Sequence, residues 1–210
     1  VNEIAALCET VGANANDVLQ GMGQDSRIGS KYLQPGPGWG GSCFPKDVRA
    51  LRVTAENNSI NLTLLSAALD SNEKAFRRIA DKVESELGNS LIGKNICVWG
   101  LAFKAGTDDL RDSPSVAVIE RLIGRGATVI AFDPVIKSAN IKSLKVVKSI
   151  EESYEAADAI LLLTEWEEFK QINPESIKGR LKNLILIDTR NVLDRKTWIN
   201  SGFKYIGNGW

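Results

Sequence analysis

The sequence predicts an α/β protein in which a helical region precedes a doubly wound parallel sheet. Up to about residue 90, apolar residues recur at intervals typical of helices. After Gly93 the pattern changes, and short apolar stretches that suit buried strands alternate with helical segments. Such alternation is typical of a parallel sheet with helices on both faces. We therefore expect two domains, a helical one at residues 1–90 and a Rossmann-like one at residues 91–210.

The helical region begins with two short predicted helices, which end at Gly12 and near Met22, and Asn14 can cap the second. The stretch GQDSRIGSKYLQPGPGWGGSCFPKD follows, and its many glycines and prolines exclude regular structure. Loops of this length within a compact domain are usually functional or disordered. A helix resumes at Pro45, a favoured first-turn residue.

A long helix is predicted from about Asn61 to Leu87. Its apolar positions have near-heptad spacing, with Asn72 as the one polar position: Leu62, Leu65, Leu69, Phe76, Ile79, Val83 and Leu87. This pattern indicates packing against a partner helix. Because about 25 helical residues span almost ~40 Å, we expect a dimer or interdomain interface here.

The second half of the chain reads as strands joined by helices. A helix capped by Ser113 is predicted over residues 114–124, and another over residues 150–157. Five strands are predicted, at residues 94–101, 127–134, 159–166, 184–191 and 204–209. In such sheets ligands bind beyond the carboxyl ends of the strands, so the loops FKAGTDDLRDS, DPV, TEWEEF and DTRN are candidates for binding.

Composition excludes several classes of function. The 26 basic and 26 acidic residues balance, so charge gives no reason to expect nucleic acid or an anionic membrane. No apolar run approaches the ~20 residues of a membrane span. The sequence has no histidine, so proton transfer near neutral pH must use other side chains. The chain starts with Val1 inside a helical pattern, and we interpret it as a piece of a longer protein.

Three cysteines without a CxxC pair favour neither a disulfide framework nor a zinc site, and we expect no metal. This usage fits a reducing compartment, the cytoplasm. The aspartates of TDDLRDS suit a capped, solvated loop better than a metal site.

Cys43 is the candidate nucleophile. It precedes a helix that starts at Pro45, and Lys46 and Asp47 follow within one turn. A helix N-terminus and a cation both stabilise a thiolate, and a nearby carboxylate can act as base. The alternative is a buried loop cysteine. Cys8 and Cys97 lie on an apolar helix face and inside a strand, where core packing is expected.

Three segments, GGSCFPKD, GLAFKAGTDDLRDSPS and LTEWEEF, occur in this order. Together they resemble the UDP-glucose/GDP-mannose dehydrogenase family, and within it the UDP-glucose 6-dehydrogenases. The resemblance covers essentially all 210 residues. It implies an NAD-binding N-terminal domain, a central helical region that forms a homodimer and a C-terminal UDP-sugar domain, of which this chain resembles the last two. The turn after the first predicted strand of the second domain, VWGLAFK, lacks the GxGxxG fingerprint of dinucleotide-binding domains, which agrees with this division.

The resemblance implies an NAD-dependent, four-electron oxidation of UDP-glucose to UDP-glucuronate, serving polysaccharide biosynthesis. Cys43 would carry the sugar as a thiohemiacetal and then a thioester, and Asp47 would handle the water and its proton. Arg111 would reach the NAD pyrophosphate, unless it pairs with a neighbouring aspartate. The family's catalytic lysine and asparagine would precede VNEIAALCE. The isolated chain is therefore expected to bind UDP or UDP-glucose without dehydrogenase activity.

The resemblance also implies a set of substrate-binding residues. Arg27 would reach the sugar of the neighbouring subunit, and its alternative is a solvated loop charge; for Lys104 the alternative is ordinary surface. Arg190 lies in DTRN, where the family more often has DGRN, so Thr189 could alter the local turn. Thr164 and Glu167 have capping-box spacing, which favours a structural role for LTEWEEF. The implied substrate-binding residues are Arg27, Tyr32, Leu33, Gly40, Gly41, Phe44, Phe103, Lys104 and Arg190.

Two other functions stay open. A UDP-N-acetylhexosamine dehydrogenase would use the same cysteine chemistry, although LTEWEEF favours the glucose enzyme. A non-catalytic module for UDP-sugar binding or dimerisation would keep the fold alone, and the joint presence of Cys43, Lys46 and Asp47 argues against it.

Overall fold

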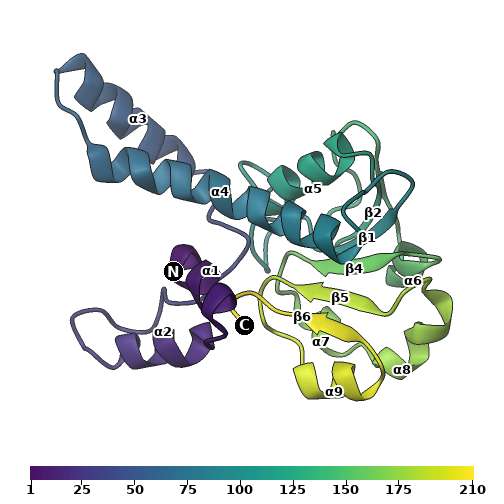
Figure 1. The fold of residues 1–210 in the computed structure, drawn as a ribbon. Helices are drawn as coiled ribbons and strands as arrows, with labels where there is room; N and C mark the ends of the chain where they lie inside the picture. Colours follow the sequence, from purple (N-terminus) through teal and green to yellow (C-terminus); the bar gives the residue numbers. More distant parts are fainter.

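Four helices form the N-terminal part of the computed structural model, which describes all 210 residues. Gly12, with φ 71°, ends the first helix, and the Asn14 side chain caps the second, as predicted. The third and fourth helices form a hairpin that projects away from the rest of the molecule (Figure 1). The helices are α1 (Asn2–Val11), α2 (Ala15–Gly23), α3 (Phe44–Asn57) and α4 (Thr63–Glu86).

The two halves of α4 have different surroundings. In its C-terminal half, Phe76, Ile79 and Val83 are buried in the main core. In its N-terminal half, Leu64 is exposed and Leu69 is only half-buried. The apolar stripe therefore packs on the sheet domain at one end and remains partly open at the other.

Six parallel strands form one sheet in the order β3-β2-β1-β4-β5-β6. The prediction of a helical region followed by a doubly wound parallel sheet is confirmed. One edge strand, β3, was not predicted, because its three residues carry little apolar pattern. The strands are β1 (Asn95–Trp99), β2 (Thr128–Phe132), β3 (Leu144–Val146), β4 (Ala159–Leu162), β5 (Ile185–Asp188) and β6 (Lys204–Ile206).

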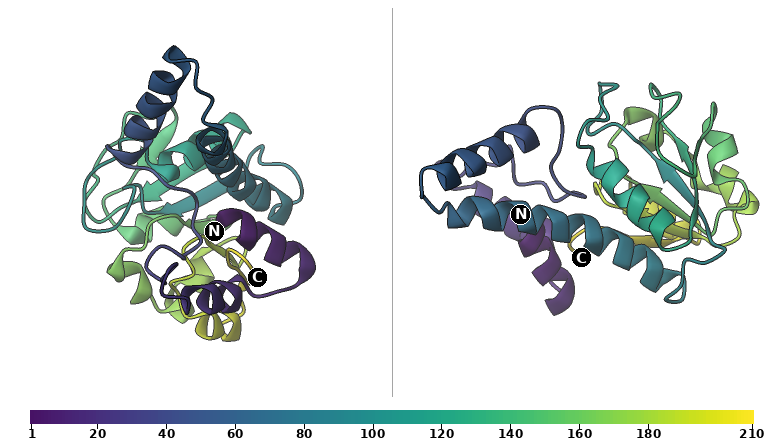
Figure 2. Two further views of the ribbon diagram at one scale, coloured as in Figure 1. Left: turned by 90° about the vertical axis from the view of Figure 1, so that its left-hand side faces the viewer. Right: turned by 90° about the horizontal axis from the view of Figure 1, so that it is seen from above.

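Helices cover both faces of the sheet. Trp99 of β1 contacts Ser153, Phe169 and Trp198, which places α6, α7 and α9 on one face. The β1–β2 and β3–β4 crossovers run in opposite directions, so right-handed connections place α5 on the other face, beside α4 (Figure 2). The helices of this part are α5 (Pro114–Gly124), α6 (Ile150–Tyr154), α7 (Glu167–Lys170), α8 (Pro174–Ile177) and α9 (Arg195–Asn200), with a 3₁₀ turn at Lys178–Arg180.

Two features of this fold position the candidate site. The strand order reverses between β1 and β4, and the carboxyl ends of these strands border the crevice where doubly wound sheets bind ligands. The glycine-rich loop between α2 and α3 runs past this edge. No helix of the structure is long and apolar enough to cross a membrane.

Candidate functional site

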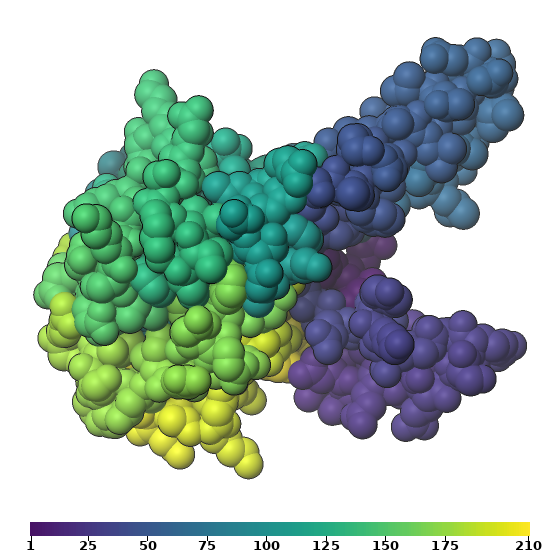
Figure 3. Space-filling view, turned by 180° about the vertical axis from the view of Figure 1, so that it is seen from behind, coloured from purple at the N-terminus to yellow at the C-terminus, as the bar shows by residue number.

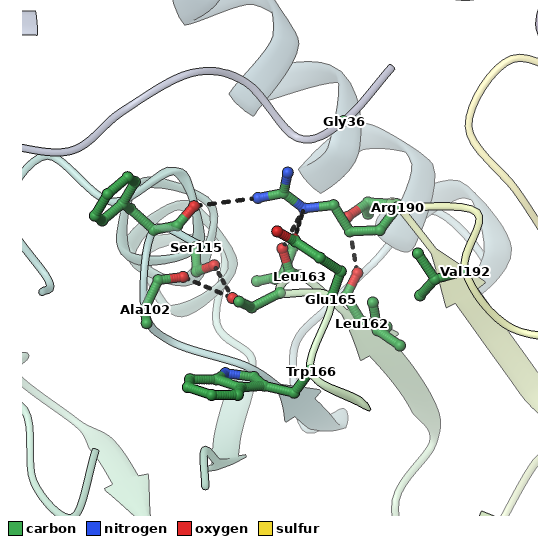
Figure 4. Close-up of polar contacts among 12 residues, drawn as sticks. Gly36, Ala102, Ser115, Leu162, Leu163, Glu165, Trp166, Arg190 and Val192 are labelled. Carbon is green, nitrogen blue, oxygen red and sulfur yellow. Dashed lines mark hydrogen bonds and ion pairs between the residues drawn. The ribbon is translucent and has the colours of Figure 1, made fainter. Parts of the chain in front are cut away.

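The side chain of Arg190 lies at the carboxyl ends of β1 and β4, between which the strand order reverses. It lies two residues beyond β5, yet its Nε donates to the Leu163 carbonyl (2.8 Å) and its Nη2 to the Phe103 carbonyl (3.3 Å). Its Nε also lies 3.1 Å from a Glu165 carboxylate oxygen. Figure 4 shows this guanidinium above the end of β4, with Gly36 nearby. Burial lowers the pKa of Arg190, while Glu165 and Asp188 partly offset that effect.

The glycine-rich loop meets the sheet domain at Gly40 and Gly41. A Cβ on Gly41 would lie 2.8 Å from the Phe103 ring, and one on Gly40 would overlap the Asp112 carbonyl. Gly41 also has φ +95°, which disfavours any other residue. Two glycines are therefore required for this contact. Lys104 Nζ lies 5.5 Å from the centroid of the same Phe103 ring, within the range of a cation–π interaction.

Cys43 lies two residues after Gly41 and is the N-cap of α3, and its side chain is exposed. Its Sγ lies 3.7 Å from the Ser42 hydroxyl oxygen. The 14 residues of α3 direct their N-terminal amides toward this position. The thiol is therefore accessible, and the predicted alternative of a buried loop cysteine does not apply.

Two ion pairs flank Cys43. Lys46 pairs with Asp47, which raises the pKa of Lys46, and the charge of Cys43 adds a smaller contribution. Arg111 pairs with Asp109 (Nη2–Oδ2, 2.8 Å), which raises the pKa of Arg111 and lowers that of Asp109 to about 2. The charge of Cys43 contributes to the raised pKa of both cations, so both lie close to the thiol. In this structure the Asp47 carboxylate forms an ion pair with Lys46. Arg111 forms an ion pair with Asp109, which is the alternative that the sequence analysis gave for this arginine.

The remaining predicted residues lie at different distances from this centre. Arg27 pairs with Asp25 (2.6 Å) and its side chain is 87% exposed, which is the solvated alternative for this residue. Tyr32 is 91% exposed and lines a cavity of about 540 Å³ together with Gly36 and Arg190. Leu33 packs against the small core between α1 and α2. Figure 3 shows the α1–α2 part of the chain separated from the α3–α4 hairpin by a gap.

The structure thus brings together eight of the predicted residues, and Phe44 borders them with an exposed ring packed edge-on against Trp39 at 4.8 Å between centroids. The eight are Gly40, Gly41, Cys43, Asp47, Phe103, Lys104, Arg111 and Arg190.

Asp133 was missed by sequence reasoning, and it bears on cofactor binding. It follows β2 and is fully buried, and its Oδ2 accepts from the Leu101 and Ala102 amides (2.8 and 3.2 Å). In dinucleotide-binding sheets the turn after β1 approaches a pyrophosphate and an acid near this position binds the ribose. Here the acid and the turn bond each other, so the residues present do not fit a dinucleotide at this turn.

Thr164 corrects one expectation. The predicted capping box with Glu167 is wrong, because Trp166 is the N-cap of α7 and makes no side-chain cap. Instead, buried Thr164 donates from Oγ1 to the Ala102 carbonyl (2.6 Å) and lies 3.3 Å from the Ser115 hydroxyl. A tertiary bond of this kind leaves no local pattern in the sequence.

Comparison with known proteins gives one consistent family. Residues 1–74 match the central domain, and residues 97–195 the UDP binding domain, of the UDP-glucose/GDP-mannose dehydrogenase family. A UDP-glucose 6-dehydrogenase of Rickettsia conorii is 42% identical over the whole chain, which spans 50% of that relative.

Solved structures agree with this match. A UDP-glucose dehydrogenase from Pyrobaculum islandicum superposes over 100% of this chain and 46% of its own, with a TM-score of 0.86 at 30% identity. A UDP-D-ManNAc dehydrogenase from Pyrococcus horikoshii covers 99% of this chain and 47% of its own, with a TM-score of 0.82, also at 30% identity.

Proposed function

The chain belongs to the UDP-glucose/GDP-mannose dehydrogenase family, and on this premise we propose that it forms the central and substrate-binding part of an NAD-dependent UDP-glucose 6-dehydrogenase. One observation supports this most: the loop that ends at Cys43 lies on Phe103, beside the strand ends at which Arg190 is fixed. A nucleophile is thereby held next to a nucleotide-binding crevice.

The proposed chemistry uses Cys43 as a temporary carrier. Oxidation of the sugar C6 alcohol gives an aldehyde, and the Cys43 thiolate adds to its carbonyl carbon to form a thiohemiacetal. Loss of a second hydride from C6 leaves a thioester, and water cleaves it to the carboxylate and the free thiol. Covalent capture retains the reactive aldehyde between the two oxidations. Lys46 and Arg111 favour the thiolate, and Asp47 takes the proton of the water.

The other residues hold the substrate. Arg190 offers its remaining N–H groups to an anionic oxygen, and its contacts with Leu163 and Phe103 fix its orientation. Phe103 and Lys104 border the nucleotide, and the backbone at Gly40 and Gly41 approaches the sugar. Tyr32, Leu33 and Phe44 line the site, and Arg27 reaches the sugar of a second copy in a homodimer formed by the central helices.

NAD bound to the full-length enzyme would supply the hydride acceptor for both oxidations. Because the turn after β1 does not fit a dinucleotide, we place the cofactor on sequence outside this chain, which spans about half the length of its curated relatives. Arg111 is the residue here that would bind its pyrophosphate, because its exposed guanidinium can exchange Asp109 for a phosphate. We place the reaction in the cytoplasm, as a source of UDP-glucuronate for polysaccharide biosynthesis.

The test is a count of NADH released per nucleotide sugar by the full-length enzyme. UDP-glucose, UDP-GlcNAc and UDP-ManNAc are offered separately, and we expect two NADH from UDP-glucose alone. Two NADH from an N-acetylhexosamine would instead identify the related dehydrogenase, and none from any sugar would support a binding module. The isolated chain is expected to bind UDP without forming NADH.

A further inference from the structure

Asn72 interrupts the apolar stripe of α4, and the structure gives this interruption a partner. Its Oδ1 accepts from the Trp39 N–H (2.9 Å), and its Nδ2 donates to the Trp39 carbonyl (2.9 Å). One side chain thus bonds both backbone groups of a single loop residue. Asn72 is 9% exposed, and a buried amide is tolerated in such a stripe only when its donor and acceptor are both satisfied.

On the loop, Gly38 packs directly against Asn72 and Phe76 of α4. A Cβ at Gly38 would lie 2.8 Å from Asn72 Oδ1 and would overlap the Phe76 ring. Its φ of +139° is also unfavourable for other residues. The loop therefore approaches α4 as closely as its backbone allows, and only at the register in which Trp39 faces Asn72.

From Trp39 the contact extends to the nucleophile. The Trp39 ring packs edge-on against Phe44, the first residue of α3, at 4.8 Å between ring centroids. Cys43 is the N-cap of that helix. Between Trp39 and Cys43, the two glycines are seated on the sheet domain. A glycine-rich segment loses much conformational entropy when it is ordered. The contacts of Trp39 and of the two glycines therefore determine where the end of the loop, Cys43, lies.

We propose that Asn72 is a positioning residue for the nucleophile: through Trp39 it sets the register of the loop that holds the Cys43 thiol against the substrate carbon. This role rests on the proposed function. It predicts a selective effect, because only the second oxidation needs the thiol at C6, whereas the first is a hydride loss that does not use Cys43.

The test compares Asn72→Ala and Asn72→Asp in the full-length enzyme. Asn72→Ala removes both hydrogen bonds to Trp39. Asn72→Asp keeps an acceptor for the Trp39 N–H but loses the donor to the Trp39 carbonyl. Asn173→Ala is the matched control, since Asn173 caps α8 far along the chain and its loss costs stability alone. The readouts are NADH per UDP-glucose consumed, free aldehyde trapped by hydroxylamine, the KM for UDP-glucose and the rate of Cys43 alkylation by iodoacetamide.

For Asn72→Ala we expect acid formation to slow about 100-fold, the scale of a ~1 Å misplacement of a reacting group. NADH per sugar should fall from two toward one, with aldehyde released and KM changed less than about twofold. Asn72→Asp should lie between Asn72→Ala and the wild type. If both oxidations instead fall in parallel with thermal stability, as in the Asn173→Ala control, the positioning role is wrong.

The alkylation rate separates this proposal from the proposed function. A wild-type enzyme that releases no NADH contradicts the proposed function. An unchanged Cys43 alkylation rate in both Asn72 variants contradicts the positioning role whether or not NADH is formed.

Discussion

Two buried carboxylates organise the loops at the ligand edge of the sheet. Asp133 after β2 bonds the backbone after β1, and Asp188 at the end of β5 accepts from the Val192 and Leu193 amides (2.9 Å each). Both are fully buried. These acids satisfy the backbone amides that they bond, so in the proposed function these amides do not bind the substrate and the side chain of Arg190 does.

The hydrogen bond between Tyr205 and Asp188 makes the free energy of unfolding depend on pH. The Tyr205 hydroxyl donates to Asp188 Oδ2 (2.8 Å), and burial and then the Asp188 charge raise the Tyr205 pKa. The Tyr205 pKa is therefore higher in the folded state than in the unfolded state. The hydrogen bond to Asp188 contributes its full stabilisation below the unfolded-state pKa of about 10, and this contribution falls as the pH rises above that value. Tyr205→Phe should cost about 1 kcal/mol at pH 8. Urea unfolding should show this difference shrinking above about pH 10; a constant difference up to about pH 11 contradicts the assignment.

The three cysteines should differ in reactivity. Burial raises the pKa of Cys97 to about 12, and Cys8 is buried between α1 and α2, whereas Cys43 is exposed. Because the thiolate is the reactive form, a thiol reagent should label one residue in the native chain and all three in denaturant. Peptide mapping checks this. Native labelling of Cys97 before Cys43 would show that the burial described here is wrong.

At the scale of elements, the C-terminal tail joins the helices to the sheet. Asn208 is fully buried and donates to the Gly36 carbonyl (3.1 Å), while Arg78 of α4 donates to its Oδ1 (2.6 Å). Next to it, the Gly209 carbonyl accepts from the Ala15 amide (2.8 Å). The tail beyond β6 therefore bonds α4 and the glycine-rich loop through Asn208 and the start of α2 through Gly209.

Gly209 should be a sensitive position of this tail. A Cβ there would lie 2.5 Å from the Ala15 Cβ, and its φ is +100°. Gly209→Ala should therefore destabilise the chain by about 1–3 kcal/mol through overpacking and backbone strain. Gly179→Ala is the control, because nothing lies within 4 Å of its Cβ position. Equal unfolding midpoints for the two variants would contradict the docked tail.

Strands and helices with strong local patterns were predictable, and long-range contacts were not. Strands β1, β2, β4, β5 and β6 carry enough apolar residues to be recognised, whereas β3 is a three-residue edge strand that only its pairing with β2 defines. The cysteine loop was identified by its composition and by resemblance. Asn72 bonds Trp39, Asp133 bonds the Leu101 and Ala102 amides, and Asn208 bonds Gly36 and Arg78; each of these partners is 31 or more residues away in sequence, so no local pattern could reveal them. For Asn72 the sequence showed only a polar gap in a stripe.

At the scale of the whole molecule, the helical part and the sheet domain meet at the candidate site. The glycine-rich loop contacts α4 through Trp39, the sheet domain through Gly41 and the tail through Gly36. Arg49 of α3 adds an ion pair with Asp112 (2.6 Å), which is half-exposed and contributes at most ~1 kcal/mol. Packing of the loop, rather than charge, therefore sets the position of Cys43.

The central claim is that Cys43 carries the substrate carbon, and trapping the covalent intermediate tests it most directly. The full-length enzyme is quenched with acid during turnover of UDP-glucose and NAD, and its peptides are analysed by mass spectrometry. We predict a sugar adduct on the peptide that contains Cys43, and neither adduct nor acid product with Cys43→Ala. Undiminished formation of UDP-glucuronate by Cys43→Ala, or an adduct on another residue, would contradict the account.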